Sequence, residues 1–304
     1  MDSDESKEES KEQRPHIMNP FSTIGHDDMD ALKNILVPQS NPPPEAEKLK
    51  TCVIGIGKVG SALWRILSQY YDVIPLDPEQ GYGLPETIED VDHLHISFPY
   101  SDIFERQVVS WITRLNPTCT IIHSMVKPGT TRHIISKLED NAELCIGDNV
   151  VHSPVMGRHP FLLEQISSFI KIVGGVSASS TIIASEILKK VGFTVMGFES
   201  CDESEWASVL LRLREARDWA YAKELHRWTS SKELNFNQIY GAYTQAWNKG
   251  QMGMENVDDM HSIMDIHSTN AEKDIIDAMD ILKKSVKPKE GLRPMILDIN
   301  IDDI

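Results

Sequence analysis

The stretch 51–67 limits the possible folds of this chain more than any other. A short apolar run, 52–54, leads directly into three glycines, and residues that favour a helix follow. Glycines in G-x-G-x-x-G spacing between a strand and a helix are typical of a dinucleotide-binding turn, because they permit a tight turn, close approach of a pyrophosphate and close helix packing. We therefore expect the helix N-terminus to bind the phosphates through Gly55, Gly57, Lys58, Val59 and Gly60.

An acidic residue completes this pattern. A second apolar run ends at Asp77, and an acidic side chain about 20 positions after the glycines accepts hydrogen bonds from ribose hydroxyls. A carboxylate at this place would repel the 2′-phosphate of NADP, so we expect NAD as the cofactor. The alternative interpretation is a glycine-rich turn with an aspartate on the surface.

Strand-like and helix-like segments alternate after Asp77. Apolar runs recur at 93–98, 118–123, 148–153, 168–173 and 192–196, with amphipathic segments between several of them. This alternation predicts an α/β fold with a Rossmann-like, doubly wound, mostly parallel sheet. From residue 202 onward the pattern is helical only, which predicts a smaller all-helical domain.

Three regions follow from these patterns. We expect residues 1–47 to form a disordered acidic tail and a proline-rich linker, because their composition cannot build a core. Residues 48–200 are predicted to be the NAD-binding Rossmann domain. Residues 201–304 are predicted to be the helical domain for dimerisation and substrate binding.

Charge and composition exclude several classes of protein. The net charge of −16 over 304 residues argues against a nucleic-acid partner, because a phosphate backbone would be repelled. The sequence has no apolar run of the roughly 20 residues that cross a membrane, and its first residues lack the apolar core of a signal peptide. We therefore expect a cytoplasmic protein with no membrane partner. The four cysteines show no C-x-x-C pairing, so we expect buried free thiols and no metal site.

Two longer segments carry a resemblance to a known family. The stretch MVKPGTTRHI, 125–134, and the stretch HSPVMGRHPFLLEQISSFIKIVGG, 152–175, resemble the UDP-glucose/GDP-mannose dehydrogenase family of the 6-phosphogluconate dehydrogenase-like superfamily. The predicted helix 205–224 is similar to the long helix by which that family dimerises. The resemblance covers roughly 50–250 and implies a Rossmann fold, NAD and a homodimer. Members of the family oxidise a nucleotide-sugar alcohol to a carboxylate with two NAD, through a cysteine-bound intermediate.

The chain departs from this family where the chemistry takes place. No cysteine follows Cys201, so the covalent second oxidation has no thiol nucleophile. Aligning the family's helix with 205–224 places Ser208 at its lysine position and Arg212 at its asparagine position. The chain is also shorter than the full-length members, and we expect no counterpart of their terminal nucleotide-sugar domain. These departures favour a single two-electron oxidation of a small anionic or nucleotide-sugar-like substrate.

The candidate catalytic residues follow predicted strands. Ligands of an open α/β sheet bind outside the carboxyl ends of its strands, and Ser124 and His152 stand at two such ends. A histidine can take the hydroxyl proton as hydride leaves, so we predict His152 and Ser124 as catalytic residues and Ser124 also as a cofactor contact. The segments SMVK and HSPVMG also resemble prephenate-type dehydrogenases. In the alternative interpretation Ser124 caps a turn and His152 is a half-buried strand-end residue with its hydrogen bonds satisfied.

Three basic residues are candidates for binding an anionic substrate group. Arg212 can clamp a carboxylate or phosphate, and Arg158 and Lys127 lie in predicted loops. Each of them could instead be solvated, and Arg212 could pair with Glu215 or Asp218. Three functions therefore stay open. They are an NAD-dependent dehydrogenase acting on a small-molecule hydroxyl, a prephenate-type dehydrogenase, and a catalytically silent NAD-binding or scaffold protein.

Overall fold

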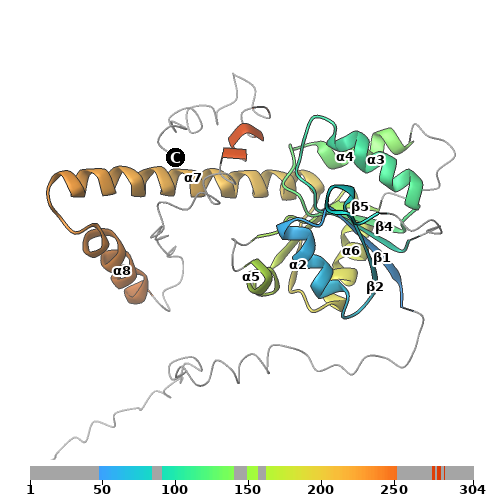
Figure 1. Cartoon of the computed structure of the whole chain (residues 1–304), viewed down its shortest axis with the longest axis horizontal. Helices are drawn as coiled ribbons and strands as arrows, with labels where there is room; N and C mark the ends of the chain where they lie inside the picture. The colour runs from blue at the N-terminus through green and yellow to red at the C-terminus, as the bar shows by residue number, and fades with distance from the viewer. Residues whose placement is uncertain are drawn as a thin grey trace, which may run out of the picture. The chain divides into compact units, whose positions relative to one another are not determined.

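The computed structural model describes residues 48–83, 91–139, 149–156 and 162–251, together with 276, 277, 279–281 and 284. The predicted disordered tail, 1–47, lies outside the described residues. The helices and strands, labelled as in Figure 1, are β1 (Lys50–Ile54), α2 (Lys58–Leu67), β2 (Asp72–Leu76), η2 (Pro78–Gln80), β3 (His93–Ile96), α3 (Phe104–Leu115), β4 (Cys119–Ile122), α4 (Thr130–Glu139), β5 (Val150–His152), α5 (Leu162–Ser168), β6 (Lys171–Gly175), α6 (Ala178–Lys190), β7 (Val195–Gly197), α7 (Cys201–Ser231), η3 (Asn237–Ala242) and α8 (Tyr243–Gln251).

The strands form one sheet in the order β2-β1-β3-β4-β5-β6-β7. All neighbours are parallel except β5 and β6, which are antiparallel. The predicted Rossmann-like, mostly parallel α/β fold is therefore confirmed. Among the described residues no strand pairs with the outer edge of β2, which explains why Pro75 is tolerated there without a backbone N–H.

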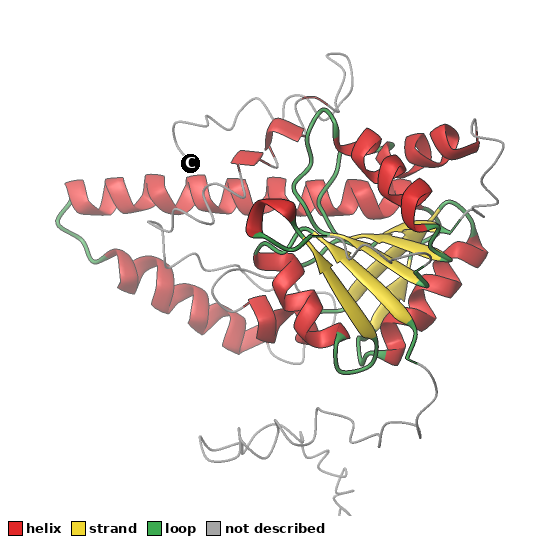
Figure 2. Cartoon of the chain, turned by 45° about the vertical axis from the view of Figure 1, so that its right-hand side comes forward, coloured by secondary structure: helices red, strands yellow, loops and turns green. Residues whose placement is uncertain are grey.

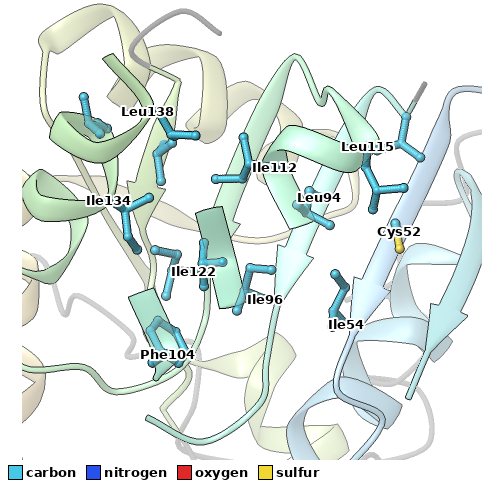
Figure 3. Packing of buried hydrophobic residues seen from close by; sticks show 14 of the residues in the cluster. Cys52, Ile54, Leu94, Ile96, Phe104, Ile112, Leu115, Ile122, Ile134 and Leu138 are labelled. Atoms are coloured by element: carbon cyan, nitrogen blue, oxygen red, sulfur yellow. The ribbon is translucent and has the colours of Figure 1, made fainter. Parts of the chain in front are cut away.

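The sheet has a separate apolar core on each face, and helices cover both faces (Figure 2). Side chains alternate between the faces of a strand, so Leu94 and Ile96 of β3 join one core while His93 and His95 point to the other face. The first core, part of which Figure 3 shows, packs the sheet against α3 and α4. The second core packs it against α2, α5 and α6.

The helical part of the chain begins with α7, which is 31 residues long. The start of α7 lies very close to β6, because a Cβ added at Gly174 would be only 2.3 Å from the carbonyl oxygen of Ser200. Farther along, Val209, Leu213 and Trp219 are buried in a third apolar cluster with Phe236. Residues Pro43–Ile304 form one compact unit, so the proposed domain boundary near residue 200 stays a prediction.

The cysteines that the structure describes agree with the expectation from the sequence. Cys52, Cys119 and Cys201 are buried free thiols. Burial raises the pKa of the Cys52 and Cys119 thiols to about 12, so both are inert at neutral pH.

No helix in the described part of the chain is long and apolar enough to span a membrane.

Candidate dinucleotide site and its surroundings

The glycine turn between β1 and α2 has the geometry that its spacing predicts. Gly55 has a positive φ of 87°, and a Cβ there would lie 2.7 Å from the backbone nitrogen of Phe98. A Cβ at Gly60 would lie 1.8 Å from the carbonyl oxygen of Gly55, so no other residue fits this packing. At Gly57, by contrast, nothing lies within 4 Å of an added Cβ. The first and third glycines therefore serve the fold, while the second leaves open space beside the turn.

The N-terminus of α2 has no side-chain cap. Gly57 is the N-cap residue, and the first turn contains no acidic residue. Two other helices do have side-chain caps at their N-termini. Ser177 and Ser180 form a capping box on α6, and Ser200 caps α7. The positive end of the α2 dipole, with no acidic side chain beside it, therefore suits an anion. The predicted residues Gly55, Gly57, Lys58, Val59 and Gly60 come together in this one turn.

Asp77 lies beside the same turn, at the end of β2. Its Oδ2 accepts a hydrogen bond from the backbone N–H of Ile56 at 2.8 Å. Gln80 donates its backbone N–H to Oδ1 at 3.3 Å and its side-chain amide to Oδ2 at 3.1 Å. A carboxylate has about four acceptor positions, so this side chain can still accept from a ribose hydroxyl. The structure thus brings Asp77 to the glycine turn.

Ser124 joins the carboxyl ends of three strands. Its hydroxyl donates to the carbonyl oxygen of Phe98 at 2.6 Å, which ties the end of β4 to the loop after β3. Its own carbonyl oxygen lies 3.2 Å from Nε2 of His152, at the end of β5. Ser124 therefore lies at the edge of the sheet where ligands of α/β proteins bind.

His152 is fully buried, and both of its ring nitrogens have partners. Nδ1 lies 2.9 Å from the hydroxyl oxygen of Ser204 on α7, and Nε2 faces the carbonyl oxygen of Ser124. Burial lowers the pKa of His152 to about 3, so the ring is neutral at pH 7. A neutral imidazole fits these partners when Nε2–H donates to Ser124 and Nδ1 accepts from Ser204. This arrangement connects β5 to α7, and the catalytic role of His152 stays a prediction.

Glu205 is a site residue whose contacts the sequence did not indicate. This fully buried carboxylate on α7 accepts from the backbone N–H groups of Gly129, at 2.6 Å, and Thr131, at 2.8 Å, and from the Thr131 hydroxyl at 2.6 Å. Burial raises its pKa, while the three hydrogen bonds oppose that shift. The bonds fasten the loop before α4 to α7. Local sequence could not show this pairing, because the partners are 74 and 76 positions apart.

The side of α7 that carries Glu205 meets two more loops from the carboxyl edge of the sheet. Tyr100, which follows β3, and Met125, which follows β4, pack against the α7 cluster that contains Val209 and Leu213. The predicted edge and the first half of α7 therefore bound one region of the molecule.

The predicted substrate-binding residues are less clearly placed. Nη1 of Arg212 forms an ion pair with Glu215 at 2.6 Å, and the two side chains are only 17% and 18% exposed. The Ser208 hydroxyl donates to the backbone carbonyl of Glu205 at 2.8 Å. Lys127 is half-buried, and its carbonyl closes the turn that begins α4. Arg158 lies outside the described residues. Within the described part of the chain, no hydrogen bond or ion pair joins Arg212 to Lys127.

No cluster of side chains suited to a metal ion occurs in the segments that the structure describes.

These features define a class of protein: a Rossmann-type dinucleotide fold with an open helix N-terminus beside an acidic strand end. Neither a protein-family model nor a curated protein matches the sequence. Solved structures do match. The UDP-D-ManNAc dehydrogenase of Pyrococcus horikoshii is similar with a TM-score of 0.64 and 16% identity, over 84% of this chain and 69% of that chain.

Two further structures are similar to this chain. The UDP-glucose dehydrogenase of Pyrobaculum islandicum has a TM-score of 0.59 at 14% identity, over 85% of this chain and 69% of that one. The 3-hydroxyisobutyrate dehydrogenase of Mycobacterium tuberculosis has a TM-score of 0.58 at 14% identity, over 83% and 92%. Similarity at these identities confirms the resemblance at the level of the fold.

Proposed function

We propose that this chain binds NAD and is an NAD-dependent dehydrogenase that oxidises a hydroxyl group of a small anionic or nucleotide-sugar-like substrate. The observation that carries the proposal is the Gly55–Gly60 turn with Asp77 beside it, where the carboxylate is held 2.8 Å from the N–H of Ile56. An open helix N-terminus suits a pyrophosphate and a carboxylate suits ribose hydroxyls. A 2′-phosphate would meet the negative charge of Asp77, so NAD is favoured over NADP.

The residues present fit the dinucleotide. The amides of Lys58 and Val59 would hold the pyrophosphate, Gly57 leaves room for it, and Asp77 would accept from the ribose. With the phosphates at α2 and the ribose at β2, the carboxyl ends of β3 and β4, including Ser124, would face the remaining part of the cofactor. When bound, the nicotinamide supplies the acceptor for a hydride.

The kind of substrate is proposed from the structural neighbours and from the sequence. The neighbours are dehydrogenases of UDP-D-ManNAc, UDP-glucose and 3-hydroxyisobutyrate, which supports an anionic compound with a hydroxyl group. No cysteine follows Cys201 in the sequence, so a thiol-dependent second oxidation lacks its nucleophile. The proposed reaction is therefore one two-electron step.

The chain's own residues would orient the substrate and take its proton. We propose Arg212, Lys127 and Arg158 for the anionic group and His152, next to Ser124, for the hydroxyl proton. His152 can accept a proton at Nδ1 only if the Ser204 hydroxyl turns toward another acceptor, and the carbonyl of Cys201 lies 2.9 Å from that hydroxyl. With the Ser204 hydroxyl turned toward Cys201, its oxygen would accept from a protonated Nδ1.

A second function is favoured because the polar groups on α7, and His152 that contacts α7, already have hydrogen-bond or ion-pair partners within the chain. His152 is buried with two partners, Ser208 bonds to its own helix, and Arg212 pairs with Glu215. The same contacts are expected in a protein that has kept the NAD-binding fold but does not catalyse a reaction. The second candidate is thus a catalytically silent NAD-binding protein.

Kinetics separate the two candidates. A panel of hydroxy acids and nucleotide sugars is incubated with the protein and NAD, and NADH formation is followed by absorbance. With an active substrate, Arg212→Ala should raise the Michaelis constant about tenfold or more, and His152→Gln should lower turnover about a hundredfold. The exposed Arg214 is the matched control, because Arg214→Ala removes the same charge from the next part of α7. Normal kinetics in both test variants, or no NADH from any hydroxyl compound, would replace the dehydrogenase with the silent protein.

We also propose that the protein is a homodimer through α7. Three apolar residues of α7, Val209, Leu213 and Trp219, are buried within the chain itself. Tyr221, with 59% exposed, and Trp228, with 51%, remain available for a second copy. Light scattering at micromolar concentration should give twice the chain mass, and Tyr221→Lys combined with Trp228→Lys should give a monomer. A monomeric unaltered chain would contradict the proposal. The cytoplasmic location stays a prediction.

A further inference from the structure

Three buried titratable side chains form a row across one face of the sheet. Nζ of Lys171, at the start of β6, lies 3.3 Å from Nδ1 of His123, which directly follows β4. Nε2 of His123 lies 2.8 Å from Nδ1 of His95 on β3. The two imidazole rings are parallel, with an angle of 3° between their planes. The exposed fractions of Lys171, His123 and His95 are 1%, 2% and 0%, so water does not screen the row.

The lysine end of this row lies at the carboxyl edge of the sheet. Nζ of Lys171 also donates to the carbonyl oxygens of Ser153, at 2.9 Å, and Pro154, at 3.0 Å, which directly follow β5. His123 directly precedes Ser124 in the chain. The row therefore lies directly beneath the edge where the proposed cofactor would extend.

The row can hold two different numbers of protons with the same contacts. A charged Lys171 donates to the two carbonyls and to Nδ1 of His123, and Nε2–H of His123 then donates to Nδ1 of His95. A neutral Lys171 donates only to the carbonyls, accepts from Nδ1–H of His123, and reverses the bond between the histidines. Both arrangements leave only Nε2 of His95 without a partner, and that atom has none in the structure. Nδ1 of His123 also lies 3.0 Å from the carbonyl oxygen of Ser153, to which it can donate only when it is protonated. Removing one proton from the row therefore keeps the contacts among Lys171, His123 and His95 and adds the bond from His123 to Ser153.

The surroundings of the row are basic and offer no counterion. Within the part of the chain that the structure describes, no carboxylate pairs with Lys171, and burial lowers its pKa to about 7. In addition to burial, His93, on the same strand and face as His95, lowers the pKa of His95, and His152 lowers the pKa of His123. Burial lowers the pKa of His93 itself, the charge of Asp92 raises it, and the charge of Lys190 lowers it. A new positive charge at the carboxyl edge would therefore lower the affinity of this row for its proton.

We propose that Lys171, His123 and His95 hold one proton whose occupancy is coupled to the charge of the ring bound at the carboxyl edge of the sheet. The oxidised nicotinamide ring is positively charged, so its binding drives the proton from the row into water. The reduced ring is uncharged and leaves the proton in place. In each molecule whose row is protonated, the exchange breaks one N–H bond and releases one H⁺ to water, with no change in oxidation state. This inference rests on the proposed NAD site, and it makes Lys171 a positioning residue that senses the cofactor through charge.

Calorimetry measures this proton directly. NAD⁺ and NADH are titrated into the full chain near pH 7 in buffers of different ionisation enthalpy, which gives the number of protons released. We expect about half a proton to be released with NAD⁺ and almost none with NADH, because a group with a pKa near 7 is half protonated there. Lys171→Met should abolish this difference. Lys189→Met, at an exposed position on α6, removes the same charge and should leave it intact.

The histidine tautomers test the row without any cofactor. Nitrogen NMR of the unaltered protein should place the protons of His123 and His95 on Nε2 below about pH 6 and on Nδ1 above about pH 8, on either side of the Lys171 titration. Equal proton release with NAD⁺ and NADH, or tautomers that do not change over this range, would overturn the inference. If neither NAD⁺ nor NADH binds, the proposed function fails and the coupling with it, while a tautomer change would still establish the row.

Discussion

The β1–α2–β2 unit and the first half of α7 border the same candidate site, but the residues that their hydrogen bonds join are separated by different distances along the sequence. In β1–α2–β2 the defining hydrogen bond joins Ile56 and Asp77, which are 21 positions apart. In α7 the carboxylate of Glu205 binds residues 74 and 76 positions earlier. The first region is therefore held by contacts within about 20 positions, while the second is held by contacts between segments far apart in the chain.

The two regions also differ in what they leave unbonded. The first turn of α2 has no side-chain cap, and a Cβ at Gly57 would point into open space. On α7, Ser204, Glu205 and Arg212 all have partners within the chain. The comparison teaches that the turn before α2 has space and no side-chain cap, whereas α7 uses most of its polar groups to hold the fold.

The most sensitive test of this difference adds one methyl group at either of two glycines in the turn before α2. Gly60→Ala should lower the free energy of unfolding by about 3 kcal/mol, because its Cβ would lie 1.8 Å from a backbone oxygen that cannot move away. Gly57→Ala should change stability by less than about 0.5 kcal/mol, because its Cβ meets nothing within 4 Å. It should nevertheless weaken NADH binding about tenfold or more, because the methyl group occupies the space for the pyrophosphate. Urea unfolding and fluorescence titration give the two quantities.

The matched pair of glycine variants also shows how the proposal could fail. If Gly57→Ala binds NADH as the unaltered protein does, the open space is not the pyrophosphate site. If Gly60→Ala is as stable as Gly57→Ala, the close packing of α2 on β1 is not what requires the third glycine.

A second substitution tests the long-range half. Glu205→Ala should lower the free energy of unfolding by about 2–3 kcal/mol, because it leaves the N–H groups of Gly129 and Thr131 without their acceptor. Asp202→Ala is the control on the same helix. Its pair with Arg132 is largely exposed, with side chains 40% and 49% accessible, so its loss should cost about 0.5 kcal/mol or less. Equal losses in the two variants would mean that Glu205 does not fasten the loop to α7.

These two tests correspond to what the sequence could and could not predict. The glycine spacing and Asp77 predicted the turn and the helix, because both signals lie within one βαβ unit. The alternation of strand-like and helix-like segments predicted the mostly parallel sheet. Local patterns place residues along the chain but do not choose their distant partners. The bonds of Glu205 and of the Lys171 row could therefore not be predicted.

His152 illustrates the same limit within the candidate site. Its position after a predicted strand was correct, since it ends β5 at the carboxyl edge of the sheet. Its burial and its contact with Ser204 depend on α7 packing against β5, which is a tertiary contact between segments 52 positions apart. A histidine at a strand end looks the same in the sequence whether it faces a ligand or a helix.

The smallest expected effect concerns the charge of Asp77. Asp77→Asn keeps the shape of the side chain and an oxygen that can accept from the N–H of Ile56, so the turn should stay intact. It removes the negative charge that would repel a 2′-phosphate, so the preference for NADH over NADPH should fall about fivefold, mainly through tighter NADPH binding. Glu79→Gln is the control, because it removes the same charge two positions away on the exposed side of η2. Competitive titration with both cofactors measures the ratio. An unaltered protein that binds NADPH as tightly as NADH would show that Asp77 does not set the preference. An equal change in the Glu79 variant would show that overall charge, rather than a carboxylate at the ribose, discriminates between the two cofactors.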